Sequence, residues 1–244
     1  MSAVNAIIDI ADMFGAEAAT GEAGWLATQR AAERLGLAAV NAAGVFTRSG
    51  EPVWIRYGMQ ADWVESYTSG RMYEVDPVIG WIASDSLSGQ FCCADVRAAA
   101  PRRQAAEMAD LLEDYRYRHL LGRKWVEGPI TKTVLFCTED PAEAVLPPET
   151  LAILPAVSAM MAGRLNAPQD CAGFLGMAYR PLSGREKDVL SYLAAGLDNN
   201  QIAARLGLAE VTVRMHMSRA RKKMGAATRE QALALAMARG MLDL

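Results

Sequence analysis

Hydrophobic and polar positions follow two different periods along the 244-residue chain, and the change of period predicts where helices and strands alternate. In residues 4–14 and 23–35, apolar side chains recur every three or four positions, which is typical of amphipathic helices. Residues 37–47 and 53–59 are strand-like, and the sequence Arg-Ser-Gly-Glu-Pro at 48–52 predicts a turn between them. The chain is therefore expected to begin with two helices and to continue into a β-hairpin.

The same patterns predict further elements up to residue 165. The expected helices cover residues 61–67, 77–84, 102–120 and 148–165, and the expected strands cover residues 90–96, 124–130 and 133–138. Pro155 is expected to kink or interrupt the last helix, because proline removes a backbone hydrogen bond. Five strands with helices at both ends indicate an α+β fold, an α/β/α sandwich around a mainly antiparallel five-stranded sheet.

The periodicity fails at residues 166–180, where proline and glycine stand among small and polar residues. Beyond this segment the helical period returns in four short runs. We therefore expect a first domain at residues 1–165, a linker at 166–180, and a small all-α domain of four helices at 181–244.

The last domain carries explicit signals for helix starts and ends. Segments 183–186 and 228–231 fit the capping box, and segment 198–201 is a variant that uses aspartate as the N-cap. Glycines that are expected to end the helices follow the apolar runs, at positions 196, 207, 225 and 240. Ala209 offers the third helix no side-chain cap, which should cost about 1 kcal/mol.

The third helix of this domain, at residues 210–224, is expected to have one buried face and one basic face. The apolar face has helical spacing and consists of Val213, Met217, Ala220 and Met224. Five cations accompany the single carboxylate of Glu210, as contact with phosphates requires: Arg214, Arg219, Arg221, Lys222 and Lys223. A short helix, a glycine turn and a second, basic helix form the helix-turn-helix arrangement, whose second helix enters the major groove of DNA.

The net charge of −3 conceals an asymmetry that supports this interpretation. Residues 182–244 contain ten Lys and Arg against six Asp and Glu, a net charge of +4, which leaves −7 for residues 1–181. A nucleic-acid partner is therefore expected at the C-terminal end only.

The cysteines and the chain's hydropathy exclude several other classes of protein. Cys92, Cys93, Cys137 and Cys171 have no metal-ligand spacing, so we expect neither a metal site nor a cofactor. No signal peptide and no apolar run of roughly 18 residues is present, so we expect a cytoplasmic protein that does not enter a membrane. An enzyme that used Cys92 or Cys93 with His119 would need a third, orienting group, which the sequence does not supply nearby.

In the first domain, two aromatic residues and one acid suggest a binding pocket. Trp63 and Tyr67 are four residues apart and would share a helix face, and Asp76 lies in an apolar neighbourhood. An indole N–H, a phenol and a carboxylate would suit a small neutral ligand that carries carbonyl groups and an N–H. Alternatively, the rings fill the core and Asp76 caps a helix that begins at Pro77. These residues by themselves leave both possibilities open.

The C-terminal pattern resembles the LuxR-type DNA-binding domain over roughly sixty residues. The matching positions are Leu182-x-x-Arg185-Glu186-x-x-Val189-Leu190, Ala195-Gly196-Leu197-x-Asn199-x-x-Ile202-Ala203-x-x-Leu206-Gly207, Thr212-Val213-Arg214-x-His216 and Lys223-Met224-Gly225. Ala209 departs from the serine usual in that family.

On such a helix the side chains divide into readers of bases and holders of phosphates. Arg214, Met215 and Ser218 are expected to face base edges, with Arg214 reading guanine. Val211 is expected beside a thymine methyl group. The residues expected on phosphates are Thr212, Arg219, Lys222 and Lys223. For His216 we expect a structural hydrogen bond rather than a base contact.

The order and spacing of Trp63, Tyr67 and Asp76-Pro77 are similar to those of the domain that binds N-acyl homoserine lactones in quorum-sensing LuxR-type regulators. The resemblance implies that Trp63 donates to the lactone carbonyl and that Asp76 accepts the amide N–H. It also implies that Tyr67 reaches the acyl carbonyl or walls the acyl chain.

The chain departs from this family pattern at several positions. Phe91 stands where a tryptophan beside the lactone ring is common, and Met59 stands where a tyrosine is frequent, with Tyr57 two residues earlier. Within residues 117–122 only Gly122 fits the family pattern, and Thr133 and Thr138 are both candidates for a strand hydroxyl that meets the ligand.

Together these patterns predict a ligand-responsive transcription regulator without enzymatic activity. We expect it to bind an N-acyl homoserine lactone and to bind a palindromic operator in double-stranded DNA as a homodimer. The principal alternative is a regulator with the same DNA-binding domain that needs no ligand or responds to another small molecule. A phosphorylation-driven response regulator is disfavoured, because no acidic pair follows the first strand.

Overall fold

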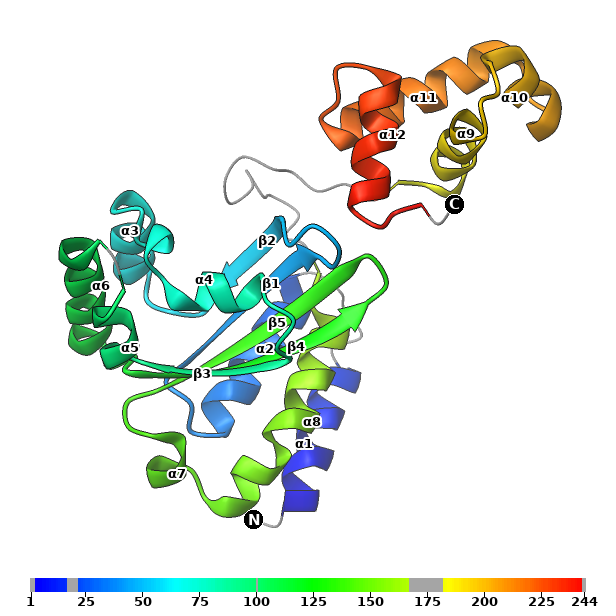
Figure 1. Cartoon of the computed structure of the whole chain (residues 1–244). Helices are drawn as coiled ribbons and strands as arrows, with labels where there is room; N and C mark the ends of the chain where they lie inside the picture. The colour runs from blue at the N-terminus through cyan, green and yellow to red at the C-terminus, as the bar shows by residue number, and fades with distance from the viewer. Residues whose placement is uncertain (1–2, 17–21, 100, 167–181, 243–244) are drawn as a thin grey trace.

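The computed structural model describes residues 3–16, 22–99, 101–166 and 182–242. An α+β domain precedes a small domain of helices, and the helical domain lies beyond one end of the sheet (Figure 1). The fold class is as the sequence predicts. Cys171 and all but the first residue of the expected linker lie outside the described residues, so the linker stays a prediction.

The first domain is built on one antiparallel sheet with the strand order β2-β1-β5-β4-β3. The strands are β1 (Ala39–Phe46), β2 (Pro52–Tyr57), β3 (Ser88–Cys92), β4 (His119–Glu127) and β5 (Ile130–Thr138). Every residue of the central strands β1 and β5 is buried, because helices cover both faces of the sheet. Successive side chains alternate between these two faces.

Three helices pack on one face: α1 (Ala3–Ala16), α2 (Glu22–Arg34) and α8 (Pro148–Arg164), with the short α7 (Ala142–Val145) preceding α8 (Figure 1). Val40 and Phe136 from the sheet pack here with Met161 of α8. Pro155 lies inside α8 and does not interrupt it. The Ser158 hydroxyl donates to the Pro155 carbonyl at 2.8 Å, so this carbonyl has a side-chain hydrogen-bond partner.

The other face carries α3 (Ala61–Ser69), η1 (Met72–Glu74), α4 (Pro77–Ile82), α5 (Cys93–Arg97) and α6 (Arg102–Asp114). Their buried residues form a second core, which includes Trp63, Tyr67, Met108 and Leu112. The two cores on either side of the sheet complete the α/β/α sandwich.

The structure corrects two boundaries in the middle of this domain. Residues 93–96, expected to continue a strand, belong to α5 instead, because Asp95 accepts the Cys92 backbone N–H at 2.7 Å and caps a helix there. The helix expected at 102–120 ends at Asp114, since Arg116 adopts a left-handed φ of 61°. As a result β4 begins at His119, several residues before the expected strand.

The second domain consists of α9 (Gly184–Ala194), α10 (Asn199–Leu206), α11 (Glu210–Met224) and α12 (Arg229–Ala238). The capping boxes expected before α9 and α10 are both present. Before α12 only half of the box forms, because the Gln231 side chain accepts from Ala227 rather than from Thr228. Ala209 provides no side-chain cap, and the four glycines expected to end helices all have positive φ.

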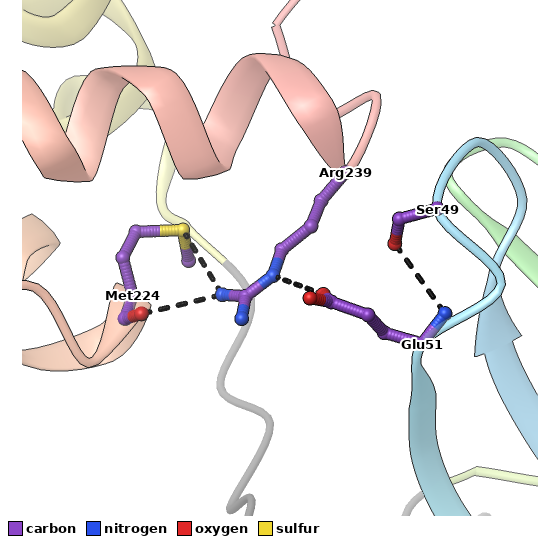
Figure 2. A network of polar contacts seen from close by, with 4 residues as sticks. All are labelled: Ser49, Glu51, Met224 and Arg239. Atoms are coloured by element: carbon purple, nitrogen blue, oxygen red, sulfur yellow. Dashed lines mark hydrogen bonds and ion pairs between the residues drawn. The ribbon is translucent and has the colours of Figure 1, made fainter.

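The two domains meet where the hairpin between β1 and β2 lies against the end of α12 (Figure 2). Arg239 donates from Nε to the Glu51 carboxylate at 2.9 Å and from Nη1 to the Met224 carbonyl at 3.3 Å. Its guanidinium also lies 5.0 Å from the ring centre of Phe46. Arg239 of the helical domain is thus held both by the β1–β2 hairpin and by its own domain.

Candidate functional site

A largely apolar cavity lies between the sheet and helices α3, α4 and α6. The enclosed volume that a water-sized molecule can occupy is about 40 Å³. Alternate residues of the central strands form its floor: Asn41 and Ala43 from β1, and Thr133 and Leu135 from β5. A cavity with apolar walls and a few polar groups is the usual form of a small-molecule site.

Two aromatic side chains of α3 stand together in the wall of this cavity. Trp63 and Tyr67 stack with ring centres 4.8 Å apart and an interplanar angle of 17°. Their four-residue spacing places both on the buried face of α3, as the sequence predicts. Tyr57 of β2 packs on both rings, at 6.3 Å from Trp63 and 6.0 Å from Tyr67.

Asp76 caps α4, which is one of the two possibilities that the sequence left open, and it also lines the cavity. Its Oδ1 accepts the Val78 backbone N–H at 2.8 Å and caps α4, and Pro77 is the first residue of that helix. Its Oδ2 accepts the Tyr67 hydroxyl at 2.8 Å. Because a carboxylate has about four acceptor positions, Asp76 can still accept an N–H from a molecule in the cavity.

The environment of Asp76 changes its acidity. Burial raises the pKa of its carboxyl group to about 6, although the hydrogen bonds from Val78 and Tyr67 act in the opposite direction. The carboxylate is thus ionised at neutral pH but loses its charge under mildly acidic conditions.

Two hydrogen-bond donors in the cavity wall are unused. Within the described part of the chain, the indole nitrogens of Trp63 and Trp81 are buried and have no hydrogen-bond partner. An unsatisfied buried donor costs roughly 1–3 kcal/mol, so a bound molecule with suitably placed oxygens would recover this energy. The cavity therefore offers two N–H donors and one carboxylate acceptor.

The other candidate residues of the first domain divide into those that line the cavity and those that do not. Met59 and Tyr57 line it, and Met59 accepts a hydrogen bond at sulfur from Asn41 at 3.3 Å. Phe91 does not line the cavity; it packs edge-on against Trp81, with ring centres 5.8 Å apart. Pro77 starts α4 and is likewise not part of the lining.

The two threonines that the sequence left as alternatives are distinguished by their positions. Thr133 lines the cavity and donates a long hydrogen bond of 3.3 Å to the Ala43 carbonyl. Thr138 instead donates to the Asp140 carbonyl at 2.8 Å and lies away from the lining.

Sequence reasoning did not single out Trp81. This residue lies on α4, five positions after Asp76, and its ring occupies the space above Gly122 of β4. A Cβ atom at position 122 would lie 2.3 Å from the ring, so glycine is needed there. Two sequence features could have indicated Trp81: it lies on the helix that Asp76 caps, and Gly122, which matches the family pattern, leaves room for a large ring.

On α11, the buried and exposed faces are those that the sequence predicts. Val213, Met217, Ala220 and Met224 are buried against the neighbouring helices. The residues expected to read bases are exposed, among them Arg214, Met215 and Ser218, and Val211 is 70% exposed. Arg219 and Lys222 are exposed as well, and Thr212 is partly buried.

Several polar side chains of α11 already have partners. Arg214 forms an ion pair with Glu210 on the same helix at 2.8 Å, and this pair must open for Arg214 to contact a base. Lys223, which we expected on phosphate, lies 2.7 Å from the buried carboxylate of Glu186 and thus holds α11 on α9. The His216 Nδ1 atom is buried without a partner among the described residues, so the expected structural hydrogen bond does not form there.

Two other kinds of site are absent from the described residues. No group of His, Cys, Asp and Glu in them is arranged to hold a metal ion. No helix formed by those residues is long and apolar enough to cross a bilayer.

The cysteine and histidine considered for an enzyme lie next to each other in the sheet. Cys92 and His119 are paired across β3 and β4. Burial raises the pKa of the adjacent Cys93, which favours its unreactive thiol form.

Two family models match this chain. The model described as "Autoinducer binding domain" matches residues 22–119, and the model described as "Bacterial regulatory proteins, luxR family" matches residues 180–236. The transcriptional activator protein AhyR of Aeromonas hydrophila is 26% identical over 191 residues, which cover 74% of this chain and 70% of AhyR.

Solved structures with the same fold also match. SdiA in complex with octanoyl-rac-glycerol has a TM-score of 0.62 at 17% identity, covering 91% of this chain and 90% of that one. CepR2 from Burkholderia cenocepacia, described as N-acylhomoserine lactone dependent, has a TM-score of 0.51 at 15% identity, covering 66% of this chain and 92% of that one. At such low identity these two likenesses concern the fold alone.

Proposed function

This chain belongs to the LuxR family of bacterial regulatory proteins, and we propose that it senses an N-acyl homoserine lactone and binds a palindromic operator as a homodimer. An autoinducer-binding domain joined to a LuxR-type helix-turn-helix makes it a quorum-sensing transcription regulator rather than an enzyme. Three parts of this statement are proposals: that the ligand is an N-acyl homoserine lactone, that the protein is a homodimer, and that its operator is palindromic.

The observation that carries the ligand proposal is the grouping of Trp63, Tyr67 and Asp76 on one cavity. An N-acyl homoserine lactone has one amide N–H, which Asp76 can accept, and carbonyl oxygens, which the free indole N–H groups can bind. Its acyl chain would contact apolar lining such as Leu120 and Leu135. The arrangement thus pairs each polar group of the ligand with a group that is otherwise incompletely used.

A second ligand class has specific support. The SdiA structure named above contains an octanoyl glycerol, which has an ester carbonyl and hydroxyl groups but no amide. Asp76 can accept a hydrogen bond from a hydroxyl as well as from an N–H. An acylated glycerol is therefore the alternative ligand that the experiment must include.

We expect the wild-type protein to retain a lactone and an Asp76 variant to lose it. Protein produced in cells supplied with a mixture of N-acyl homoserine lactones and 1-octanoyl glycerol is extracted with organic solvent, and the extract is analysed by mass spectrometry. Asp76→Asn should reduce affinity for the retained lactone by about 10- to 100-fold, because a charge-assisted hydrogen bond is lost. Asp62→Ala, an exposed position on the same helix α3, is the matched control and should bind normally.

The possible results separate the hypotheses. Retention of octanoyl glycerol alone would replace the lactone proposal by the second ligand class. If circular dichroism shows that Asp76→Asn is folded and its lactone affinity equals that of the wild-type protein, Asp76 is not part of the binding site.

The DNA proposal rests on the exposed basic face of α11. A two-fold dimer presents two such helices, so the half-sites of the operator are expected one helical turn of DNA apart, or a multiple of it. Arg214 can reach a guanine through two parallel hydrogen bonds once it leaves Glu210.

Replacement of Arg214 and of Lys222 should have different consequences. Arg214→Ala is expected to cost about 1–3 kcal/mol at one base position and to relax specificity there. Lys222→Ala should weaken binding to all operator variants similarly and reduce the salt dependence by about one phosphate contact. Gel-shift titrations over single-base operator variants and several salt concentrations measure both effects. An unchanged ranking of operators with Arg214→Ala would show that Arg214 does not read bases.

A further inference from the structure

The Tyr67 hydroxyl, which the family resemblance assigns to the acyl carbonyl of the ligand, already donates its proton within this protein. The Tyr67 hydroxyl donates its proton to Asp76 at 2.8 Å, and Asp76 needs it because the carboxylate is buried. Tyr67 therefore cannot at the same time donate to an acyl carbonyl of the ligand. A ligand with two carbonyl groups requires a second donor from elsewhere in the wall.

Trp81 has the properties of such a donor. Its side chain lines the cavity and is 8% exposed, and its indole nitrogen has no hydrogen-bond partner within the described residues. Phe91, at the position where the family commonly has a tryptophan, has no N–H to offer and packs edge-on against the Trp81 ring. Trp81 is thus a buried polar side chain in the cavity wall whose N–H has no hydrogen-bond partner among the described residues.

The surroundings of Trp81 hold its ring and strengthen its N–H as a donor. Gly122 and Phe91 pack against the ring, so few other side-chain orientations are open to it. The Lys124 ammonium lies 4.9 Å from the centre of the ring and also donates to the Trp81 carbonyl. A cation above an indole withdraws electron density from it, which makes the ring N–H a better hydrogen-bond donor.

We propose that Trp81 is a ligand-binding residue, whose indole N–H donates to a second carbonyl oxygen of the ligand while Trp63 donates to the first. The pocket then selects molecules in which one N–H, for Asp76, lies between two oxygen acceptors. The inference rests on the proposed function, and it adds the source of the second hydrogen bond.

The test observes the indole N–H groups directly. The full-length protein contains five tryptophans, and labelling them with ¹⁵N makes each side-chain N–H visible by NMR, with Trp→Phe variants for assignment. On addition of N-octanoyl homoserine lactone, the Trp63 and Trp81 proton signals should both move downfield as hydrogen bonds form. The Trp125 signal should not move, because its N–H already donates to Ser158 at 3.2 Å.

Affinity provides the second measurement. Trp81→Phe keeps an aromatic ring but removes the N–H, and calorimetry should show about 3- to 10-fold weaker binding of N-octanoyl homoserine lactone. Trp25→Phe is the matched control with unchanged affinity, because Trp25 packs on the opposite side of the sheet beside Arg56.

A Trp63 signal that moves while the Trp81 signal does not would overturn the inference and leave the proposed function intact. Unchanged affinity in Trp81→Phe, with a wild-type melting curve, would do the same. A wild-type protein that binds no lactone in calorimetry or NMR would overturn the proposed function itself, and with it this inference.

Discussion

Asp76 combines a structural role with a position in the wall of the cavity, where we propose that it binds the ligand. One oxygen caps α4 and the other accepts the Tyr67 hydroxyl, so the position of the acid is determined before any ligand arrives. Such preorganisation reduces the entropy lost on binding. Its energetic cost is the burial of a charge, and that cost explains why the pKa is raised to about 6.

The stability of the ligand-free protein should therefore depend on the charge of Asp76. The folded pKa of about 6 lies above the usual 3.8, so the contribution of Asp76 is fully present below pH 3.8 and is lost as the pH rises through 6. The loss is about 3 kcal/mol at most. The measurement is the urea unfolding free energy of wild-type and Asp76→Asn protein between pH 4 and pH 8.

The difference between the two proteins isolates this residue from other titrating groups. The unfolding free energy of Asp76→Asn minus that of the wild-type protein should increase between pH 4 and pH 7 and then become constant. Parallel pH profiles for the two proteins would contradict the assigned role of burial.

At the scale of single elements, α11 depends on a tether as well as on its apolar face. Glu186 is 3% exposed and accepts the Ser183 backbone N–H and the Lys223 ammonium, each at 2.7 Å. Burial by itself would raise the pKa of Glu186. The hydrogen bond and positive charge of Lys223, together with hydrogen bonds from Ser183, outweigh this effect and lower the pKa overall. Its stabilising contribution is thus present at neutral pH and lost in acid.

Removal of the Lys223 ammonium should destabilise the helical domain. Lys223→Met leaves the buried Glu186 carboxylate without its cation, which we expect to cost about 2–3 kcal/mol of unfolding free energy. Lys222→Met is the matched control, because Lys222 is the exposed neighbour, and its unfolding free energy should change by less than about 0.5 kcal/mol. Chemical denaturation followed by circular dichroism measures both, and equal stability of the two variants would refute the tether.

At the scale of the whole molecule, Arg239 and Glu51 connect the domains. Arg239 reaches Glu51 across the junction (Figure 2). Its side chain is 10% exposed, and its guanidinium lies beside the Phe46 ring. The hairpin that carries Glu51 joins β1 and β2, whose residues Asn41 and Ile55 line the cavity. The contact therefore links the strands of the ligand pocket to the last helix of the DNA-binding domain.

Neutralisation of Glu51 should loosen this junction. In Glu51→Gln the nearly buried guanidinium loses its counter-charge, at a cost of about 1 kcal/mol. Amide hydrogen exchange in residues 47–51 is then expected to become about fivefold faster, since the hairpin opens more readily. Ser49→Ala, in the same turn, is the control for the other amides of the hairpin; the Glu51 amide is left out of that comparison, because its N–H donates to the Ser49 hydroxyl at 3.4 Å. Identical exchange in Glu51→Gln and wild-type protein would argue against a docked hairpin.

Sequence alone determined the features whose interactions span only a few residues. The helix caps at Ser183 and Asp198, the shared face of Trp63 and Tyr67, and the apolar side of α11 all follow from contacts within about four positions. Such contacts depend on the types and spacing of neighbouring side chains, and both can be read directly from a single sequence. The order of the main strands and helices was predictable for the same reason, but η1, α5, α7, the end of α6 and the start of β4 were not.

Only the tertiary structure decided which distant residues meet. It placed Trp81 rather than Phe91 on the cavity, because Gly122 of β4 leaves room for the indole ring. It paired Lys223 with Glu186 rather than leaving it free for phosphate, and it brought Arg239 to Glu51 from 188 residues away. These pairings depend on how sheet and helices pack, and since packing depends on many residues at once, no local pattern contains it.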